Sequence, residues 1–280
     1  MVRIITDSTC DLTDELLGEF GIMSIPLTVH FGEQSFTHGK DLTSEEFFHR
    51  LRTSIKIPST AQPTPHTFEE AFTECLEKGE DVLCILLSSE LSGTLQSANI
   101  AKNALDTERI QILDSRTVSA AQGLVCLLAA EKAKTGASLD EVLALAQDLI
   151  GRVRFLAGLE TLIYLKKGGR LSGSAAVLGT MLNIHPILTT SEGKVVSVEK
   201  ARGKKKLIKL FGSMAEDWKI DTSYPVVFAH GSAPENCESL KEAFLKQHPV
   251  ARVYNGEVGP VVGTHGGPGM VDLAFIAKSE

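Results

Sequence analysis

Residues 81–94 read DVLCILLSSELSGT, and this stretch indicates which class of fold the chain adopts. From Asp81 to Leu87 the run is apolar almost throughout, which is typical of a strand buried on both faces of a parallel sheet. The run ends in Ser88-Ser89, and a helix is predicted soon afterwards, from Gly93 to Leu105. A buried strand followed closely by a helix indicates an α/β fold.

The first half of the chain repeats this alternation on both sides of the central strand. Two further strands are predicted at Val2–Ile5 and Arg109–Leu113. Helices are expected between and after them. Three of these helices have start signals, in which Thr or Ser is followed by Glu three residues later or by Pro at the first helical position. The expected helices are 43–52, 64–75, 93–105, 119–134 and 138–149. Such alternation predicts a parallel sheet with right-handed crossovers.

The pattern changes around residues 151–155, where we place the boundary between two domains. The second half predicts a hairpin at 187–198, a basic helix at 204–218, a strand at 226–229, a helix at 234–247 and a strand at 271–276. The predicted fold is therefore two α/β domains. Residues 1–150 would form a mainly parallel sheet with flanking helices, and residues 151–280 a mixed sheet with helices.

Composition limits the possible classes of protein. Of the 280 residues, 43% are hydrophobic and 22% are charged, as in soluble globular proteins. The net charge of -7 argues against nonspecific binding to nucleic acid or to an anionic membrane. The five cysteines are odd in number and form no CxxC pair, which indicates reduced thiols. With no secretory signal and no apolar run long enough to span a bilayer, the expected location is the cytoplasm.

The turn Ser88–Thr94 is the first candidate ligand site. It follows a strand and opens a helix, so its free N–H groups and the helix dipole suit an anion. Ser92 or Thr94 would add a hydroxyl donor, and Gly93 would let a ligand approach the backbone. Phosphate, sulfate and carboxylate fit equally well. The alternative is that these residues only cap the helix.

Two loops rich in proline or glycine supply further candidates. Residues 58–65 contain three prolines, which would present Ser59 and Thr60 rigidly, and the alternative, which the loop alone favours, is a stiff structural turn. Seven of the twelve residues 258–269 are glycine or proline, and the segment contains His265, which is either a donor to an anion or a structural hydrogen-bonding group.

Basic residues surround two glycines in the segment Leu165–Gly173, and a second basic run follows at Arg202–Lys206. The first resembles a phosphate-binding loop but lacks the GxxxxGK[ST] spacing of a nucleotide-binding loop. The alternative is a solvated basic surface.

Familiar catalytic and metal-binding sets are missing from the sequence. There is no HExxH, no paired-cysteine metal spacing and no GxSxG elbow, so no metal is expected. Asp7 and Asp114 follow two predicted strands and would serve either as an acid/base pair or as turn caps.

Taken together, these segments resemble the DegV family over essentially the whole chain, residues 2–279. The resemblance rests on Thr6–Leu12, Ser59–Thr64, Leu87–Thr94, Asp114–Arg116, Lys167–Gly173, His185–Leu188 and Thr264–Gly269. There are two departures: Ala61 stands where the family commonly has serine, and His185 where it commonly has lysine.

The resemblance implies that the chain binds a long-chain fatty acid such as palmitate, stearate or oleate, with no cofactor. Loops of the first domain would hold the carboxylate, and an apolar tunnel would hold the tail. The chain would present its ligand to the ATP-binding subunit of a fatty acid kinase, which makes the acyl phosphate. It would have no catalysis of its own, no nucleic acid partner and only transient membrane contact for lipid exchange.

The family motifs also imply roles for particular residues. The expected carboxylate-binding residues are Thr60, Ser92, Gly93, Thr94 and His265. Those expected to meet the kinase or the phosphorylated product are Lys167, Arg170 and Arg202.

Two other functions remain open from the sequence. One is an enzyme acting on a small phosphorylated or carboxylated metabolite, with Asp7, Asp114 or His265 as acid or base. The other is a regulatory protein that binds a partner through the basic surface of Lys166, Lys167 and Arg170, which is compatible with lipid binding.

Overall fold

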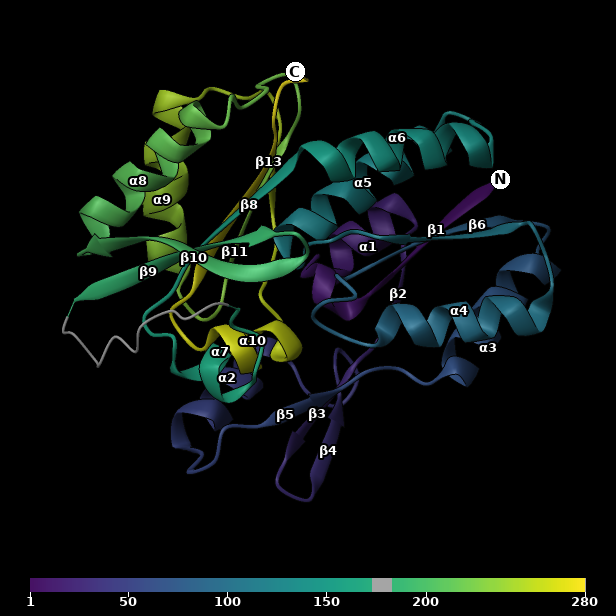
Figure 1. Ribbon diagram of the computed structural model, residues 1–280, viewed down its shortest axis with the longest axis horizontal. Helices are drawn as coiled ribbons and strands as arrows, with labels where there is room; N and C mark the ends of the chain where they lie inside the picture. The colour runs from purple at the N-terminus through teal and green to yellow at the C-terminus, as the bar shows by residue number, and fades with distance from the viewer. Residues whose placement is uncertain (173–182, 280) are drawn as a thin grey trace.

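The computed structural model describes residues 1–172 and 183–279, so Gly173 at the end of the basic motif lies outside the described residues. The described chain contains a four-stranded sheet, a six-stranded sheet and a small three-stranded sheet, with helices packed on the two larger sheets (Figure 1). The predicted α/β class, with a parallel sheet in the first half and a mixed sheet in the second, is confirmed.

The first sheet has the strand order β2-β1-β6-β7, and every neighbouring pair is parallel. Its strands are β1 (Val2–Asp7), β2 (Met23–Ile25), β6 (Asp81–Leu86) and β7 (Ile110–Asp114). Its helices are α1 (Asp14–Phe20), α3 (Pro65–Glu77), α4 (Thr94–Leu105), α5 (Ala120–Lys134) and α6 (Leu139–Arg152). A short 3-10 turn, η1 (Ser8–Cys10), follows β1.

Strand β6 is apolar because both of its faces are covered. Val82 and Cys84 belong to the core that includes α3 and α4, whereas Leu83 and Ile85 belong to the core that includes α5 and α6. Figure 1 shows these helix pairs on opposite sides of β1 and β6. Successive strand residues point to opposite faces, so a continuous apolar run fills both cores.

The helix starts predicted from local sequence are confirmed. The Ser138 side chain accepts a hydrogen bond from the Glu141 backbone while the Glu141 side chain accepts one from the Ser138 backbone, so both bonds of a capping box are present. The same box opens α2 (Ser44–Thr53). Helix α3 starts with Pro65 at its first position after Thr64.

The second sheet has the order β10-β9-β8-β13-β11-β12 and is antiparallel except between β11 and β12. Its strands are β8 (Val153–Gly158), β9 (Ile184–Ser191), β10 (Lys194–Arg202), β11 (Val226–His230), β12 (Val253–Asn255) and β13 (Val271–Ile276). The predicted hairpin is β9–β10. Its turn residues Glu192 and Gly193 both have positive φ, as the favoured two-residue hairpin turn requires.

Two helices, α8 (Lys204–Asp217) and α9 (Pro234–Gln247), cover the outer face of this sheet (Figure 1). Helix α5 lies on the other face, where it packs against β8, β11 and β13 as well as against β1 and β6 of the first sheet. Because both sheets cover it, α5 is apolar on nearly all sides.

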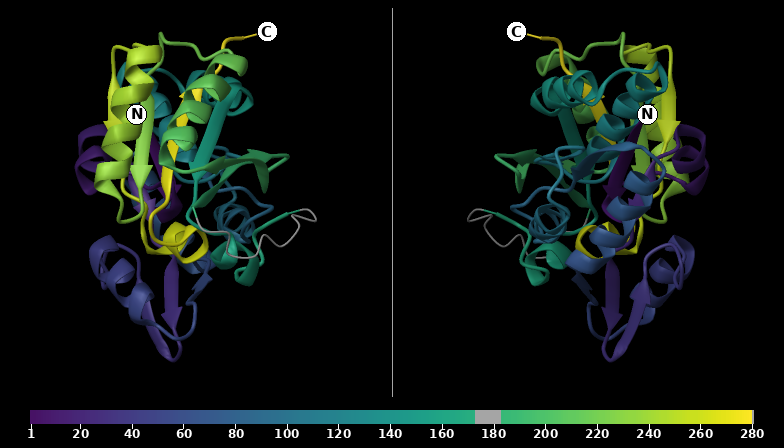
Figure 2. Two further views of the ribbon diagram at one scale, coloured as in Figure 1. Left: turned by 90° about the vertical axis from the view of Figure 1, so that its left-hand side faces the viewer. Right: turned by 90° about the vertical axis from the view of Figure 1, so that its right-hand side faces the viewer.

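The sequence did not predict the third sheet, which is antiparallel in the order β4-β3-β5. Its strands are β3 (Thr28–Phe31), β4 (Gln34–Thr37) and β5 (Ser59–Ala61). The prediction of an irregular loop over residues 58–65 is therefore wrong for β5, in which Thr60 pairs with Val29. Figure 2 shows this sheet and α2 at the end of the molecule farthest from the C-terminus.

The glycine-rich segment 258–269 also differs from the predicted loop. Pro260–Gly266 form helix α10, with Pro260 at its first position, and this helix lies beside α2 and the short helix α7 (Ile163–Lys167). Glycine at positions 259, 263 and 266 allows close packing, because a Cβ at each would lie within 2.8 Å of a neighbouring side chain. None of the helices in the described part of the chain is both long and apolar enough to cross a membrane.

Candidate ligand-binding site

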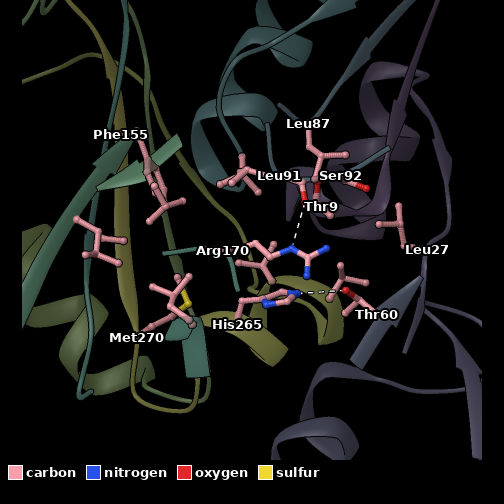
Figure 3. Close-up of a pocket in the computed structure, with 18 of the residues that line it drawn as sticks. Thr9, Leu27, Thr60, Leu87, Leu91, Ser92, Phe155, Arg170, His265 and Met270 are labelled. Carbon is pink, nitrogen blue, oxygen red and sulfur yellow. Dashed lines mark hydrogen bonds between the residues drawn. The ribbon is translucent and has the colours of Figure 1, made fainter. Parts of the chain in front are cut away.

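A cavity of about 330 Å³ lies where strands β5, β8 and β9 meet helices α7 and α10 and the turn before α4. This volume is within the usual range for small-molecule sites. Most of its wall is apolar (Figure 3). The apolar lining residues are Leu27, Ala61, Leu87, Leu91, Val118, Phe155, Ala157, Leu159, Leu165, Leu188, Val195, Val261, Val262 and Met270.

The polar side chains of the cavity gather at one end. Figure 3 shows Thr60, Ser92, Arg170 and His265 close together, while Phe155 lies at the opposite end. Among the described residues, the cavity wall includes Arg170 but no Asp or Glu side chain. The polar end therefore carries a positive charge without a lining carboxylate, which favours an anionic group.

Thr60 and His265 are 205 positions apart in the sequence but are in direct contact at the polar end of the cavity. Thr60 Oγ1 on β5 lies 3.1 Å from His265 Nε2 on α10. Burial, with a smaller contribution from the charge of Arg170, lowers the pKa of His265 to about 4. The imidazole is therefore neutral near pH 7 and exchanges one hydrogen bond with the Thr60 hydroxyl.

The backbone of Gly168 covers the other side of this imidazole. A Cβ at Gly168 would lie 2.2 Å from His265 Nδ1, so only glycine allows this approach. Nδ1 is buried and has no hydrogen-bond partner among the described residues.

Ser92 and Gly93 line the same cavity in the turn before α4, whereas Thr94 does not. Ser92 Oγ lies 2.9 Å from Thr94 Oγ1 and accepts a 3.3 Å hydrogen bond from the Thr94 backbone N–H. Ser92 is thus both a turn residue and a cavity residue, and the anion-binding role expected for it stays a prediction. Gly93 precedes α4 and has no side chain to cap the helix, and the Ser92 hydroxyl accepts from the Thr94 N–H in its place.

The sequence did not single out Gln62, which holds the Thr60 strand against the Ser92 turn. Its Nε2 donates to Gly93 O at 3.1 Å and to Ser97 Oγ at 3.0 Å. A Cβ at Gly93 would lie 2.2 Å from Gln62 Oε1. A side chain at position 93 would therefore force the Gln62 amide to move, and the ligand approach expected at Gly93 stays a prediction.

Arg170 is positioned by two backbone carbonyl groups. Its Nε donates to Leu91 O at 3.2 Å and its Nη1 to Gly168 O at 2.7 Å, which leaves the guanidinium beside the polar end of the cavity (Figure 3). Lys167 and Arg202 are exposed and do not line the cavity. Of the three expected partner-facing residues, the structure brings only Arg170 together with the candidate ligand residues.

The acid/base alternative receives little support from the geometry. Asp7 is fully buried, and its carboxylate accepts hydrogen bonds from the backbone N–H groups of Leu87 and Thr9. Asp114 accepts from Ser89 Oγ at 2.5 Å and from the Arg116 backbone at 2.8 Å. Neither aspartate lines the cavity, so His265 is the one candidate of this alternative that does.

The match to known families covers almost the entire chain. The family model described as "Uncharacterised protein, DegV family" matches residues 1–278. The chain belongs to the DegV family. A DegV domain-containing protein of Caldanaerobacter subterraneus is 34% identical over 278 residues, which cover 99% of both chains. Another, from Clostridium acetobutylicum, is 33% identical over 284 residues, covering 100% of this chain and 99% of its own.

Solved structures of other DegV proteins have the same fold. A Thermus thermophilus family member, described for its fatty acid binding, has a TM-score of 0.91 at 31% identity, with 99% of each chain covered. A Thermotoga maritima protein described as revealing a fatty acid binding function has a TM-score of 0.88 at 29% identity and the same coverage. Bacillus subtilis DegV, described as a fatty acid binding protein, has a TM-score of 0.85 at 29% identity, again with 99% of each chain covered.

Most of the DegV motifs quoted from the sequence contribute residues to the cavity wall, and they do so from both halves of the chain. Thr60 comes from the small sheet, Ser92 from the turn between β6 and α4, and Arg170 and His265 from the second half of the chain. The sequence analysis missed the apolar wall supplied by β8. The available signal was the run Phe155–Leu159, which has no polar side chain and whose alternate residues Phe155, Ala157 and Leu159 line the cavity.

Proposed function

We propose that the chain binds one long-chain fatty acid in this cavity, with its carboxylate at the polar end and its tail along the apolar wall. The observation that carries the proposal is the gathering of hydroxyl, imidazole and guanidinium groups at one end of an otherwise apolar cavity. Descriptions of DegV relatives at 29% to 31% identity as fatty acid binding proteins support the same ligand class.

In this proposal Thr60 and Ser92 donate hydroxyl hydrogen bonds to the two carboxylate oxygens. In the Nε2–H tautomer His265 donates to Thr60 Oγ1, which leaves the Thr60 hydroxyl hydrogen free to bond to a carboxylate oxygen. Gly93 supplies a backbone without a Cβ beside the head group. Thr94 acts through Ser92, whose hydroxyl it contacts at 2.9 Å.

The free energies of the individual contacts indicate that the tail determines the affinity and that the head group determines the orientation of the ligand. Burying about 14 methylenes at about 0.8 kcal/mol each is favourable by roughly 11 kcal/mol. Association costs of about 4–15 kcal/mol offset much of this gain. A hydrogen bond to a charged group contributes only about 1.5–3 kcal/mol. Removing one hydroxyl should therefore weaken binding moderately, whereas shortening the tail should weaken it strongly.

We further propose that the chain has no catalysis of its own and presents the carboxylate to the ATP-binding subunit of a fatty acid kinase. A carboxylate oxygen would attack the γ-phosphorus of ATP, forming acyl phosphate and releasing ADP. Arg170, at the polar end of the cavity, is suited to stabilise the charge added by the phosphoryl group. The exposed cations Lys167 and Arg202 are assigned to contact with the kinase.

The first test is mass spectrometry of the purified protein under native conditions, followed by solvent extraction. We expect a fatty acid at close to one per chain, or stoichiometric uptake of added oleate. Protein that is free of lipid and takes up no palmitate, stearate or oleate would refute the binding proposal.

The second test separates binding from transfer. Ser92→Ala should reduce phosphorylation of bound oleate by a fatty acid kinase subunit with ATP far more than it reduces oleate affinity. Ser89→Ala is the matched control, because Ser89 lies in the same turn but bonds to Asp114 outside the cavity. Equal losses of affinity and phosphorylation in Ser92→Ala would contradict the assigned role. Charge reversal at Arg202 should abolish phosphorylation while leaving bound lipid in place.

A further inference from the structure

A second cavity of about 320 Å³ lies on the opposite face of the six-stranded sheet from the first cavity. On and just after β8, Ala157 and Leu159 line the first cavity while Gly158 and Glu160 line the second. Successive residues of an extended chain point to opposite faces, so the two cavities share this segment as a common wall. Strand β9 also contributes to both cavities, because Leu188 lines the first and His185 lines the second.

The floor of the second cavity is apolar and lies between the sheet and helices α8 and α9. Its apolar residues are Leu207, Ile208, Leu240 and Val271. A Cβ at Gly158 would lie 2.8 Å from the Leu207 side chain, so glycine at this position keeps the helix close to the sheet. An apolar floor of this size suits an alkyl or aryl group rather than a bare ion.

The rim of the second cavity is cationic. Lys204 and Lys205 line it from the first turn of α8, a helix of 14 residues whose preceding residue, Gly203, provides no side-chain cap. The backbone N–H groups of this turn and the positive end of the helix dipole favour an oxyanion. Lys204 Nζ is held by a 2.8 Å hydrogen bond to Asn236 Oδ1, and Asn236 also lines the cavity.

A buried imidazole provides an independent indication of a ligand. His185 is 4% exposed and lines the second cavity, and its Nε2 has no hydrogen-bond partner among the described residues. Its Nδ1 lies 3.6 Å from Glu160 Oε2. An oxyanion beside Nε2 would give this nitrogen the hydrogen-bond partner that it lacks, while the ring faces Glu160 on its other side.

Glu160 is the one carboxylate among the described residues that line this cavity, and its side chain is 44% exposed. Its partial exposure lets solvent screen its charge from a ligand at the rim. The positive charge of the two lysines and of the start of α8 therefore exceeds the screened negative charge of Glu160, and the rim attracts anions.

We propose that this second cavity binds a small amphipathic anion, with a carboxylate or phosphate head at Lys204, Lys205 and the start of α8. The short apolar body of the ligand lies against Leu207 and Leu240. His185 contacts the head from the sheet side. This site is separate from the proposed fatty acid cavity, because strands β8 and β9 lie between the two.

The test is a titration of the ¹⁵N-labelled full chain with octyl phosphate, octanoate and inorganic phosphate, followed by amide chemical shifts. We expect octyl phosphate or octanoate to shift the amides of Asn236, Ser239 and Leu240 on α9, a helix that lines only the second cavity. Shifts at Gly93 and Gly266 report the first cavity independently. The titration therefore shows separately whether each cavity binds a ligand.

The variant Lys204→Ala/Lys205→Ala should weaken amphiphile binding at the second cavity by about tenfold or more, since charge-assisted contacts are lost. The matched control is Lys206→Ala/Lys209→Ala, which removes two exposed cations from the same helix outside the cavity and should leave affinity nearly unchanged. The proposal is overturned if neither amphiphile shifts the second-cavity amides, or if both double variants weaken binding equally. Inorganic phosphate binding as tightly as octyl phosphate would also overturn it, because the apolar floor would then contribute nothing.

Discussion

Replacing Asp272 with asparagine is expected to remove a pH-dependent part of the stability of the protein. Ser119 Oγ lies 2.5 Å from Asp11 Oδ2 and 2.6 Å from Asp272 Oδ2, and all three residues are at most 2% exposed. A hydroxyl carries one hydrogen and donates to one acceptor only. The other carboxyl must therefore be protonated and donate to Ser119, so the cluster holds a proton between two aspartates.

The size of the effect follows from the pKa of Asp272. Burial raises it from 3.8 to about 6, against the opposing hydrogen bond from Ser119. The folded protein holds the proton more tightly than the unfolded chain, so this contribution to stability is present below pH 3.8 and is lost as the pH rises through about 6. At about 1.4 kcal/mol per pKa unit, the loss is about 3 kcal/mol. The raised pKa of Asp11 acts in the same direction.

The assay is urea unfolding of the wild type and of Asp272→Asn at several values between about pH 4 and about pH 7. An asparagine amide can still donate to Ser119 but does not titrate. The unfolding free energy of the wild type should therefore fall by about 3 kcal/mol relative to the variant across this range. Asp217→Asn, at an exposed aspartate on α8, is the control and should show no such trend.

A difference between wild type and Asp272→Asn that stays constant with pH would refute the shared-proton interpretation. His38 and His265, whose pKa values burial lowers to about 4, change stability in the opposite direction. They are present in both proteins and cancel in the difference. The cluster also bears on the ligand site, because Asp11 Oδ1 accepts a 2.9 Å hydrogen bond from Gly259, the residue before the helix that carries His265.

Three further predictions concern the ligand cavity. Phe155→Ala, at the end opposite the polar groups, should shift the bound fatty acid toward longer chains and cost about 3–5 kcal/mol of stability; an unchanged chain profile in mass spectrometry would count against this orientation. Gly93→Ala should weaken oleate binding by displacing Gln62, and adding Gln62→Ala should recover part of the affinity in a competition assay; no recovery would rule out the steric explanation. His265→Gln should remove a loss of about 3 kcal/mol in stability that the wild type shows as the pH falls from 6.5 to about 4, and urea unfolding that reveals the same loss in both proteins would disprove it.

The parts of the fold that local sequence determines were predicted well. The capping box at Ser138 and Glu141, and the proline start of α3, depend on residues within one helical turn. The apolar run of β6 likewise reports burial on both faces. The division into two domains near residue 150 stays a prediction, although the second sheet begins with β8 at Val153.

The parts that were missed depend on contacts between distant segments. Strand β5 is three residues long and lies among prolines, so only its pairing with β3 defines it. The meeting of Thr60 with His265 joins positions 205 residues apart, and no local spacing encodes it. The family motifs grouped these two residues, but they did not indicate the clamp made by Gln62 or the cavity facing His185.

Helix α5 has a consequence for how the chain is made. During synthesis it leaves the ribosome before β8, β11 and β13, which cover one of its sides in the finished protein. Chains usually fold domain by domain, beginning at the N-terminus. Here the nascent first half would carry an uncovered apolar helix until residues near 276 emerge. Ribosome-bound chains ending after α6 should therefore recruit holdase chaperones, and completion of β13 should release them.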